Sequence, residues 1–152
     1  YASLNRKTMM DLILKTFGLE TKGTIESVHN YIDFKDLIIR KGAVSSYGDE
    51  KIIIPFNMRD GLLICQGKSN PEWNFSAPHG AGRLMSRSKA KQNIDMEAYK
   101  KSMKGVYSSC VNKATLDESP FAYKSSNVIE KAIGPTAEII DRVRPILNIK
   151  GV

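Results

Sequence analysis

The sequence predicts an α+β fold in which strands and hairpins carry the functional loops and helices pack outside them. Apolar residues recur at helical spacing in residues 4–17 and 96–103, whereas residues 51–54 and 62–65 are short apolar runs joined by a turn. The chain has 152 residues, which fits one domain that is long enough to bury a core. Its 41% hydrophobic and 26% charged residues exclude a disordered chain.

The first expected element is a helix over residues 4–17. Ser3 is its expected N-cap, and Gly18 is expected to end it. Because apolar residues recur along one face, we expect this helix to pack against the rest of the fold.

Four segments have the composition of β-strands, namely residues 24–28, 37–40, 51–54 and 62–65. The first of them leads directly into His29 and Asn30. The last two are joined by a turn at residues 55–61, so a hairpin is the simplest interpretation.

A loop rich in Gly, Pro, Asn and Ser follows at residues 67–83, and ordered loops of this length usually carry function. We expect a helix whose first turn contains residues 80–83 and which continues to Ala90. Asp95 is the expected N-cap of the next helix. Further on we expect short helices at residues 128–133 and 136–141 and an extended segment at residues 143–149.

Charge and composition restrict the class of partner. The chain has 23 Lys and Arg against 16 Asp and Glu, and its net charge of +7 favours phosphate-bearing partners. No apolar run approaches the roughly eighteen residues of a membrane span, so no membrane partner is expected. Because two cysteines are few, we expect Cys65 and Cys110 to be free core thiols of a cytoplasmic protein.

The run at residues 78–83, PHGAGR, is the first candidate for chemistry. A helix that begins after a glycine-rich turn offers unpaired N–H groups and a positive dipole end to a phosphate. The neutral imidazole of His79 could attack a nucleotide α-phosphate there, giving a phosphoramidate held by the helix start and Arg83. The alternative is a histidine that only caps a turn, since short motifs often occur by chance.

His29 and Asn30 are the second candidate. An imidazole and a carboxamide at a strand end can bind a divalent metal and a phosphate oxygen together. A regular strand sends neighbouring side chains to opposite faces, so both reach one site only if the strand ends or bulges there. The alternative is a hydrogen-bonded structural histidine. Arg40 and Lys41 either reach a phosphate or lie at a solvated strand end.

Taken together, these runs resemble the RtcB family of RNA ligases. The matching pieces occur in the family's order, at residues 29–31, 40–43, 54–61, 70–87, 117–120, 122–124 and 150–151. The resemblance covers essentially all of this chain but only the C-terminal part of a full-length family member. It implies that residues 1–152 are the C-terminal portion of a single catalytic domain whose upstream portion is absent, and the first residue, Tyr1, agrees with that expectation.

The resemblance also implies an activity and a site. The family's enzymes use GTP and Mn²⁺ to join RNA ends with a 2′,3′-cyclic phosphate or 3′-phosphate to 5′-hydroxyl ends, in tRNA splicing and RNA repair. His79 would be the nucleophile of a histidine–GMP intermediate, and His29 a manganese ligand. The implied nucleotide contacts are His29, Asn30, Pro55, Phe56, Asn57, Met58, Leu62, His79, Gly80, Ala81, Gly82 and Lys150. The implied partners are RNA, the missing upstream portion and an archease-type activator.

Two departures restrict these expectations. Leu62 stands where the family has a serine that contacts guanine, so guanine specificity is expected to be weaker. The family's other metal ligands, an Asp, a Cys and further His residues, belong to the upstream portion, so the chain alone is expected to be a poor catalyst. Two other interpretations stay open, namely a non-catalytic RNA- or nucleotide-binding module and a metal-dependent hydrolase that uses His29.

Overall fold

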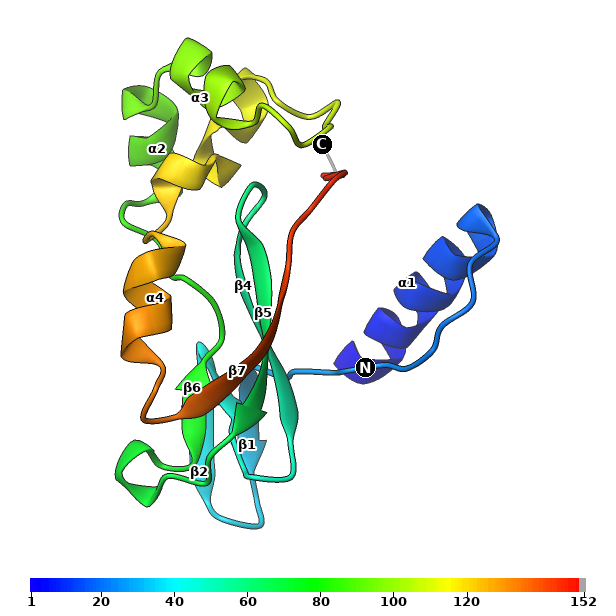
Figure 1. Ribbon diagram of the computed structural model, residues 1–152, viewed down its shortest axis with the longest axis vertical. Helices are drawn as coiled ribbons and strands as arrows, with labels where there is room; N and C mark the ends of the chain where they lie inside the picture. The colour runs from blue at the N-terminus through cyan, green and yellow to red at the C-terminus, as the bar shows by residue number, and fades with distance from the viewer. Residues whose placement is uncertain (151–152) are drawn as a thin grey trace.

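A computed structural model describes residues 1–150 of the chain; Gly151, the last residue of the matching motifs, lies outside that range. The fold is α+β with three antiparallel sheets, as the sequence predicts. Figure 1 shows the strands in the centre and lower part of the molecule, a group of helices above them, and the first helix standing apart.

A three-stranded sheet with the order β4-β5-β7 forms the centre. Strands β4 (Lys51–Asn57) and β5 (Gly61–Gly67) are the predicted hairpin, and β7 (Ala137–Val143) pairs with β5. The expectation of a helix at residues 136–141 is therefore wrong, because the open edge of β5 pairs with this isoleucine-containing run. Strand β4 lies at the sheet edge, where Pro55 removes no ladder hydrogen bond.

Two small sheets lie next to this hairpin. Strand β1 (Asn30–Asp33) pairs with β2 (Ile38–Lys41), which confirms the strand predicted at 37–40, and β3 (Ala43–Ser45) pairs with β6 (Ser76–Pro78). The strand expected at residues 24–28 is absent from the described structure, where this segment is irregular. Its Ser27 hydroxyl accepts a hydrogen bond from the Ile53 amide at 3.0 Å, so a side chain covers this part of the β4 edge.

The remaining elements are short helices. They are α2 (Arg87–Asn93), α3 (Met96–Ser102), α4 (Ser126–Ala132) and the 3-10 turns η1 (Pro71–Trp73), η2 (Lys113–Glu118) and η3 (Pro120–Ala122). Asp95 caps α3 as predicted, because its carboxylate accepts a hydrogen bond from the Ala98 amide at 2.7 Å. Residues 144–149 are irregular and contain one bridge, between Leu147 and Tyr107.

Two apolar cores hold these elements together. The larger joins the strands to α4 and contains Val44, Ile52, Ile54, Phe56, Leu63, Cys65, Ala77, Ala81, Ile129, Ile133 and Ala137. The smaller lies under α3 and contains Met58, Tyr99, Met103 and Leu116. Cys65 and Cys110 are buried and free, as expected.

Helix α1 (Ala2–Phe17) buries none of its residues, and Figure 1 shows it apart from the sheets. The expectation that it packs on the rest of the fold is therefore wrong for the described residues. Tyr1 rather than Ser3 is the N-cap, and no side chain caps this end; Gly18 ends the helix in the left-handed region, at φ 62°, as predicted. In the described part of the chain no helix is both long and apolar enough to cross a membrane.

Candidate functional site

The structure brings the two histidines together. His29 precedes β1 and His79 follows β6, and their rings stack with centroids 5.0 Å apart and planes inclined by 16°. The Gly42 amide, which links β2 to β3, donates to the His29 carbonyl at 2.8 Å. Two segments fifty residues apart therefore meet because β3 pairs with β6 and Gly42 ties His29 to β3.

Glycine is required beside His79. Gly42 has φ +68°, and a Cβ at this position would lie 3.4 Å from His79 Nε2. The absence of a side chain leaves space on that side of the imidazole nitrogen. The Gly42 amide also donates to Asn30 Oδ1 at 3.1 Å, so Asn30 is oriented by the backbone next to the histidine pair.

His79 is suited to act as a nucleophile. Its burial lowers the pKa of the imidazole, and the charge of nearby His29 lowers the pKa further. The ring is therefore neutral at pH 7, with a nitrogen lone pair available for attack.

The helix expected over residues 80–90 begins later, so the expectation that its first turn contains residues 80–83 is wrong. Helix α2 starts at Arg87, where Ser86 accepts a hydrogen bond from the Lys89 amide. The loop before it is held by other partners, because the Ala81 amide donates to the Pro55 carbonyl at 3.0 Å. Gly80 packs on the same carbonyl, which would lie 2.9 Å from a Cβ at residue 80.

The Arg83 guanidinium is held by partners within the protein. It donates to the hydroxyl of Tyr123 at 3.0 Å and to the carbonyl of Asp117. It also lies over the Tyr123 ring, 4.9 Å from the centroid. These contacts use Arg83 to join the loop after His79 to the helical part of the molecule.

Arg40 does not lie at a solvated strand end. It is 2% exposed, and its guanidinium donates to Tyr31, Asp33 and Ser76 at 2.9 Å and to the Phe75 carbonyl at 3.2 Å. Arg40 thus ties the β1–β2 hairpin to the segment that leads into His79.

The expected guanosine residues line one pocket of about 430 Å³. Pro55, Phe56, Asn57, Met58, Leu62 and Lys150 all belong to its wall, together with Gly61, Glu118, Tyr123, Val143, Pro145 and Asn148. Phe56 and Met58 are each 3% exposed because their side chains belong to the two cores. Their side chains are therefore a fixed part of the pocket wall.

Pro55 lies between this pocket and the histidines. A second pocket of about 610 Å³ contains His29, His79 and Pro55 in its wall and is closed on another side by Met10 and Leu14 of α1. We call the first cavity the base pocket and the second the histidine pocket. A nucleotide with its base in the base pocket and its α-phosphate in the histidine pocket would lie across Pro55.

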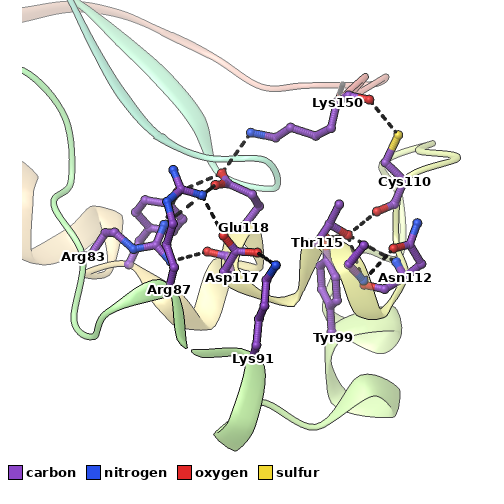
Figure 2. Close-up of polar contacts among 12 residues, drawn as sticks. Arg83, Arg87, Lys91, Tyr99, Cys110, Asn112, Thr115, Asp117, Glu118 and Lys150 are labelled. Atoms are coloured by element: carbon purple, nitrogen blue, oxygen red, sulfur yellow. Dashed lines mark hydrogen bonds and ion pairs between the residues drawn. The ribbon is translucent and has the colours of Figure 1, made fainter. Parts of the chain in front are cut away.

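Glu118 is a residue of the base pocket that the sequence did not single out. Its carboxylate accepts hydrogen bonds from Lys150 Nζ at 3.1 Å, the Tyr123 hydroxyl at 2.9 Å and Arg87 at 2.6 Å, and Figure 2 shows Lys150 pointing toward it. Burial raises the pKa of Glu118, but the donors outweigh it, so the net pKa lies below its ordinary value. An acidic pair beside a turn was the only signal in the sequence.

The described residues do not complete a metal site. His29 and His79 are neighbours, but residues 1–150 contain no group of three or more His, Cys, Asp or Glu side chains placed to hold an ion. Burial raises the pKa of Cys65 to about 11, which keeps that thiol protonated. A manganese ion at His29 would need ligands from outside the described residues.

Comparison with known proteins gives one consistent result. The family model described as tRNA-splicing ligase RtcB matches residues 1–151. The RNA-splicing ligase RtcB of Escherichia coli (strain K12) is 32% identical over 169 residues, covering 99% of this chain and 41% of that protein. The tRNA-splicing ligase RtcB of Aeropyrum pernix is 36% identical over 110 residues, covering 67% of this chain and 22% of that protein. The tRNA-splicing ligase RtcB of Archaeoglobus fulgidus is 26% identical over 192 residues, covering 99% of this chain and 39% of that protein. The chain thus spans at most 41% of the length of these relatives.

Proposed function

The chain belongs to the RtcB family, and from this premise we propose that it forms part of an RNA ligase of tRNA splicing or RNA repair. The ligase joins a 3′-phosphate or 2′,3′-cyclic phosphate end to a 5′-hydroxyl end and consumes GTP. One observation supports this assignment most directly. His79 and Pro55 line the histidine pocket, and the base pocket lies on the other side of Pro55.

His79 is the nucleophile of the proposed reaction. Its neutral imidazole forms a P–N bond with the α-phosphorus of GTP while the bond to pyrophosphate breaks, which gives histidine-bound GMP. A 2′,3′-cyclic phosphate end is first opened by water, which breaks the bond from phosphorus to O2′ and leaves a 3′-phosphate. An oxygen of the RNA 3′-phosphate then attacks the phosphorus of the histidine-bound GMP and releases the imidazole. Finally the 5′-hydroxyl attacks the RNA phosphorus, the new phosphodiester forms and GMP leaves.

The neighbours of His79 position it for the first step. Stacking on His29 fixes the plane of the imidazole, and Gly42 keeps the space next to Nε2 open. Residues 80–82 approach the nucleotide with their backbone, since Gly80 and Ala81 are docked on the Pro55 carbonyl. On the other side of Pro55, residues 55–58, Leu62 and Lys150 surround the guanine.

Manganese enters this function only through His29. The family resemblance assigns it a ligand role, but the described residues supply no completed set of ligands. The other ligands of a metal bound at His29 would come from the upstream portion of the enzyme. On the same premise the enzyme acts in the cytoplasm, on cleaved RNA, with an archease-type activator.

A labelling experiment tests this function. The protein isolated from its source at native length is incubated with GTP labelled at the α-phosphate and with Mn²⁺, and the labelled peptide is identified by mass spectrometry. We expect an acid-labile, alkali-stable label on residue 79, and its loss in His79→Ala and His79→Gln, which preserve different parts of the side-chain volume.

Two outcomes would contradict the assignment. A label that persists in both variants, or that maps to a serine or lysine, would remove His79 as the nucleophile. RNA binding that weakens with salt and does not depend on GTP, in a protein that takes no label, would indicate a non-catalytic binding module.

A further inference from the structure

A groove of about 580 Å³ lies beside the end of helix α3. Part of its wall is apolar, because Met103 belongs to the smaller core and Val106 and Val111 pack against that core. The rest of the wall is a polar rim that consists of Glu97, Lys100, Lys101, Lys104, Tyr107 and Ser108. We call this cavity the α3 groove.

The rim of the α3 groove is positively charged. Residues 98–116 contain four lysines and no Asp or Glu. Glu97 pairs with Lys100 at 2.8 Å, whereas Lys101 and Lys104 are exposed and have no acidic partner among residues 1–150. Two cationic side chains of the rim are therefore available to an anionic ligand.

The stability of α3 does not account for both lysines. A cation in the last turn of a helix is favourable, which suits Lys101. Lys104 lies beyond the end of α3, and its amide donates to the Lys101 carbonyl at 3.3 Å, so the two residues stay close. Because like charges repel, an anion bound between them would lower the energy of this arrangement.

Tyr107 adds an exposed aromatic ring to the same groove. It is 73% exposed, although its backbone is fixed. The Tyr107 amide donates to the Ile146 carbonyl, and the Tyr107 carbonyl accepts from the Asn148 amide, both at 2.9 Å. An aromatic ring on a fixed backbone can stack on a nucleobase.

These features together fit a single-stranded nucleic acid. Lysines bind phosphates of the backbone, and an aromatic ring next to an apolar floor binds an unstacked base. An acidic peptide would use the lysines but not the ring. A duplex keeps its bases stacked on one another and would leave the ring without a partner.

We propose that the α3 groove binds a single-stranded segment of the substrate RNA, with phosphates at Lys101 and Lys104 and a base stacked on Tyr107. This inference rests on the proposed function, which makes RNA the substrate. Figure 1 shows α3 in the group of helices above the strands, whereas His79 follows β6, which lies lower in the molecule. The groove therefore binds a part of the RNA away from the end that reacts at His79.

Fluorescence anisotropy with a labelled single-stranded RNA of about 20 nucleotides tests the inference on the protein at native length, at several salt concentrations. In the double variant Lys101→Ala with Lys104→Ala, we expect the RNA to bind about tenfold more weakly at low salt. The slope of log affinity against log salt should fall in magnitude by about 1.4, because each phosphate contact with a single strand contributes about 0.7.

The tyrosine variants test the other half of the groove. Tyr107→Leu keeps an apolar side chain but removes the ring, so we expect about tenfold weaker RNA binding with an unchanged salt slope. Tyr107→Phe keeps the ring and should keep the affinity. A weaker salt slope in Tyr107→Leu would mean that the ring acts only by holding the lysines.

Lys15→Ala with Lys131→Ala is the matched control. These lysines are exposed in the last turns of α1 and α4, outside the α3 groove, and their removal changes the net charge by the same amount. The control should leave the affinity and the salt slope unchanged. An equal loss in the control would show that only the overall charge matters and would overturn the inference. Circular dichroism checks that each variant is folded.

Labelling of residue 79 by GTP, measured on the same unmodified protein, separates the two levels of the argument. If the protein takes the label and the groove variants bind RNA as it does, the role of the α3 groove is overturned while the proposed function stands. If the protein takes no label but the groove variants bind RNA more weakly, the ligase function fails and the groove stands as an RNA-binding surface. Failure of the unmodified protein to bind the RNA would overturn the groove.

Discussion

The base pocket and the histidine pocket share Pro55 but differ in how their walls are held. Around the base pocket, Phe56 and Met58 belong to the two cores, and Glu118 pairs with Lys150. Around the histidine pocket, one wall is α1, which buries none of its residues, and another is the irregular segment before His29.

This difference separates two kinds of experiment. The wall residues given above for the base pocket lie within the described residues, so the proposed nucleotide binding can be assayed on this chain. The histidine pocket offers the proposed nucleophile and a second imidazole, but residues 1–150 contain no group of three metal-binding side chains. Group transfer is therefore best tested at native length, and the variants below change the two pockets separately.

The largest effect is expected from Arg40→Met, which acts on the histidine side. Arg40 is buried, and its removal takes the cationic partner from the Asp33 carboxylate and one of two donors from the Phe75 carbonyl. We expect the free energy of unfolding, measured by urea denaturation, to fall by about 3 kcal/mol.

Arg6→Met is the matched control for Arg40, because Arg6 pairs with Glu26 on an exposed surface. Its loss should cost less than about 1 kcal/mol. Equal effects of the two substitutions would mean that the Arg40 contacts do not hold the histidine side together.

A middle-sized effect is expected where the two pockets meet, in Gly80→Ala. The new Cβ would lie 2.9 Å from the Pro55 carbonyl oxygen, so the loop carrying His79 must move. We expect a loss of about 2 kcal/mol in the free energy of unfolding. In Gly23→Ala the Cβ meets open space, and this control should leave stability unchanged or slightly higher; a loss as large as that of Gly80→Ala would argue against the close contact.

The smallest effect is expected on the base side, in Glu118→Gln. The folded-state pKa of Glu118 is lowered, so its charge stabilises the fold above the ordinary pKa of 4.5, and this stability is lost as the pH falls through the lowered value. We expect the variant to lose about 1 kcal/mol at neutral pH and to show a flatter decline below about pH 5 in urea denaturation. Glu97→Gln, at an exposed carboxylate paired with Lys100, should keep the decline of the unmodified chain; an unchanged decline in Glu118→Gln would show that Glu118 is not its source.

Local signals in the sequence predicted the elements that local interactions decide. The hairpin of β4 and β5 and the capping of α3 by Asp95 follow from turn residues and side-chain caps. Residues 136–141 failed as a helix because pairing with β5 determines their conformation, and residues 24–28 failed as a strand because β4 contacts them through a side chain.

The same distinction applies to the site. His29 and His79 are identifiable from the sequence, but their stacking depends on the pairing of β3 with β6, which no local pattern encodes. The helix start expected at residues 80–83 was wrong because this loop docks on Pro55 and α2 begins only at Arg87. Glu118 was missed because its partners Arg87, Tyr123 and Lys150 are distributed along the chain.

Pro55, which lies in the walls of both pockets, fixes the distance between them. The proline ring restricts the backbone angle φ, and the Pro55 carbonyl accepts a hydrogen bond from the Ala81 amide. Pro55 therefore cannot move without breaking this contact with the loop that carries His79. In a nucleotide bound across Pro55, the sugar must span the distance between the base pocket and the histidine pocket. We expect a guanosine nucleotide analogue with one extra methylene between the sugar ring and the phosphorus to bind in the base pocket. Its phosphorus should then lie away from the position that the His79 imidazole can attack.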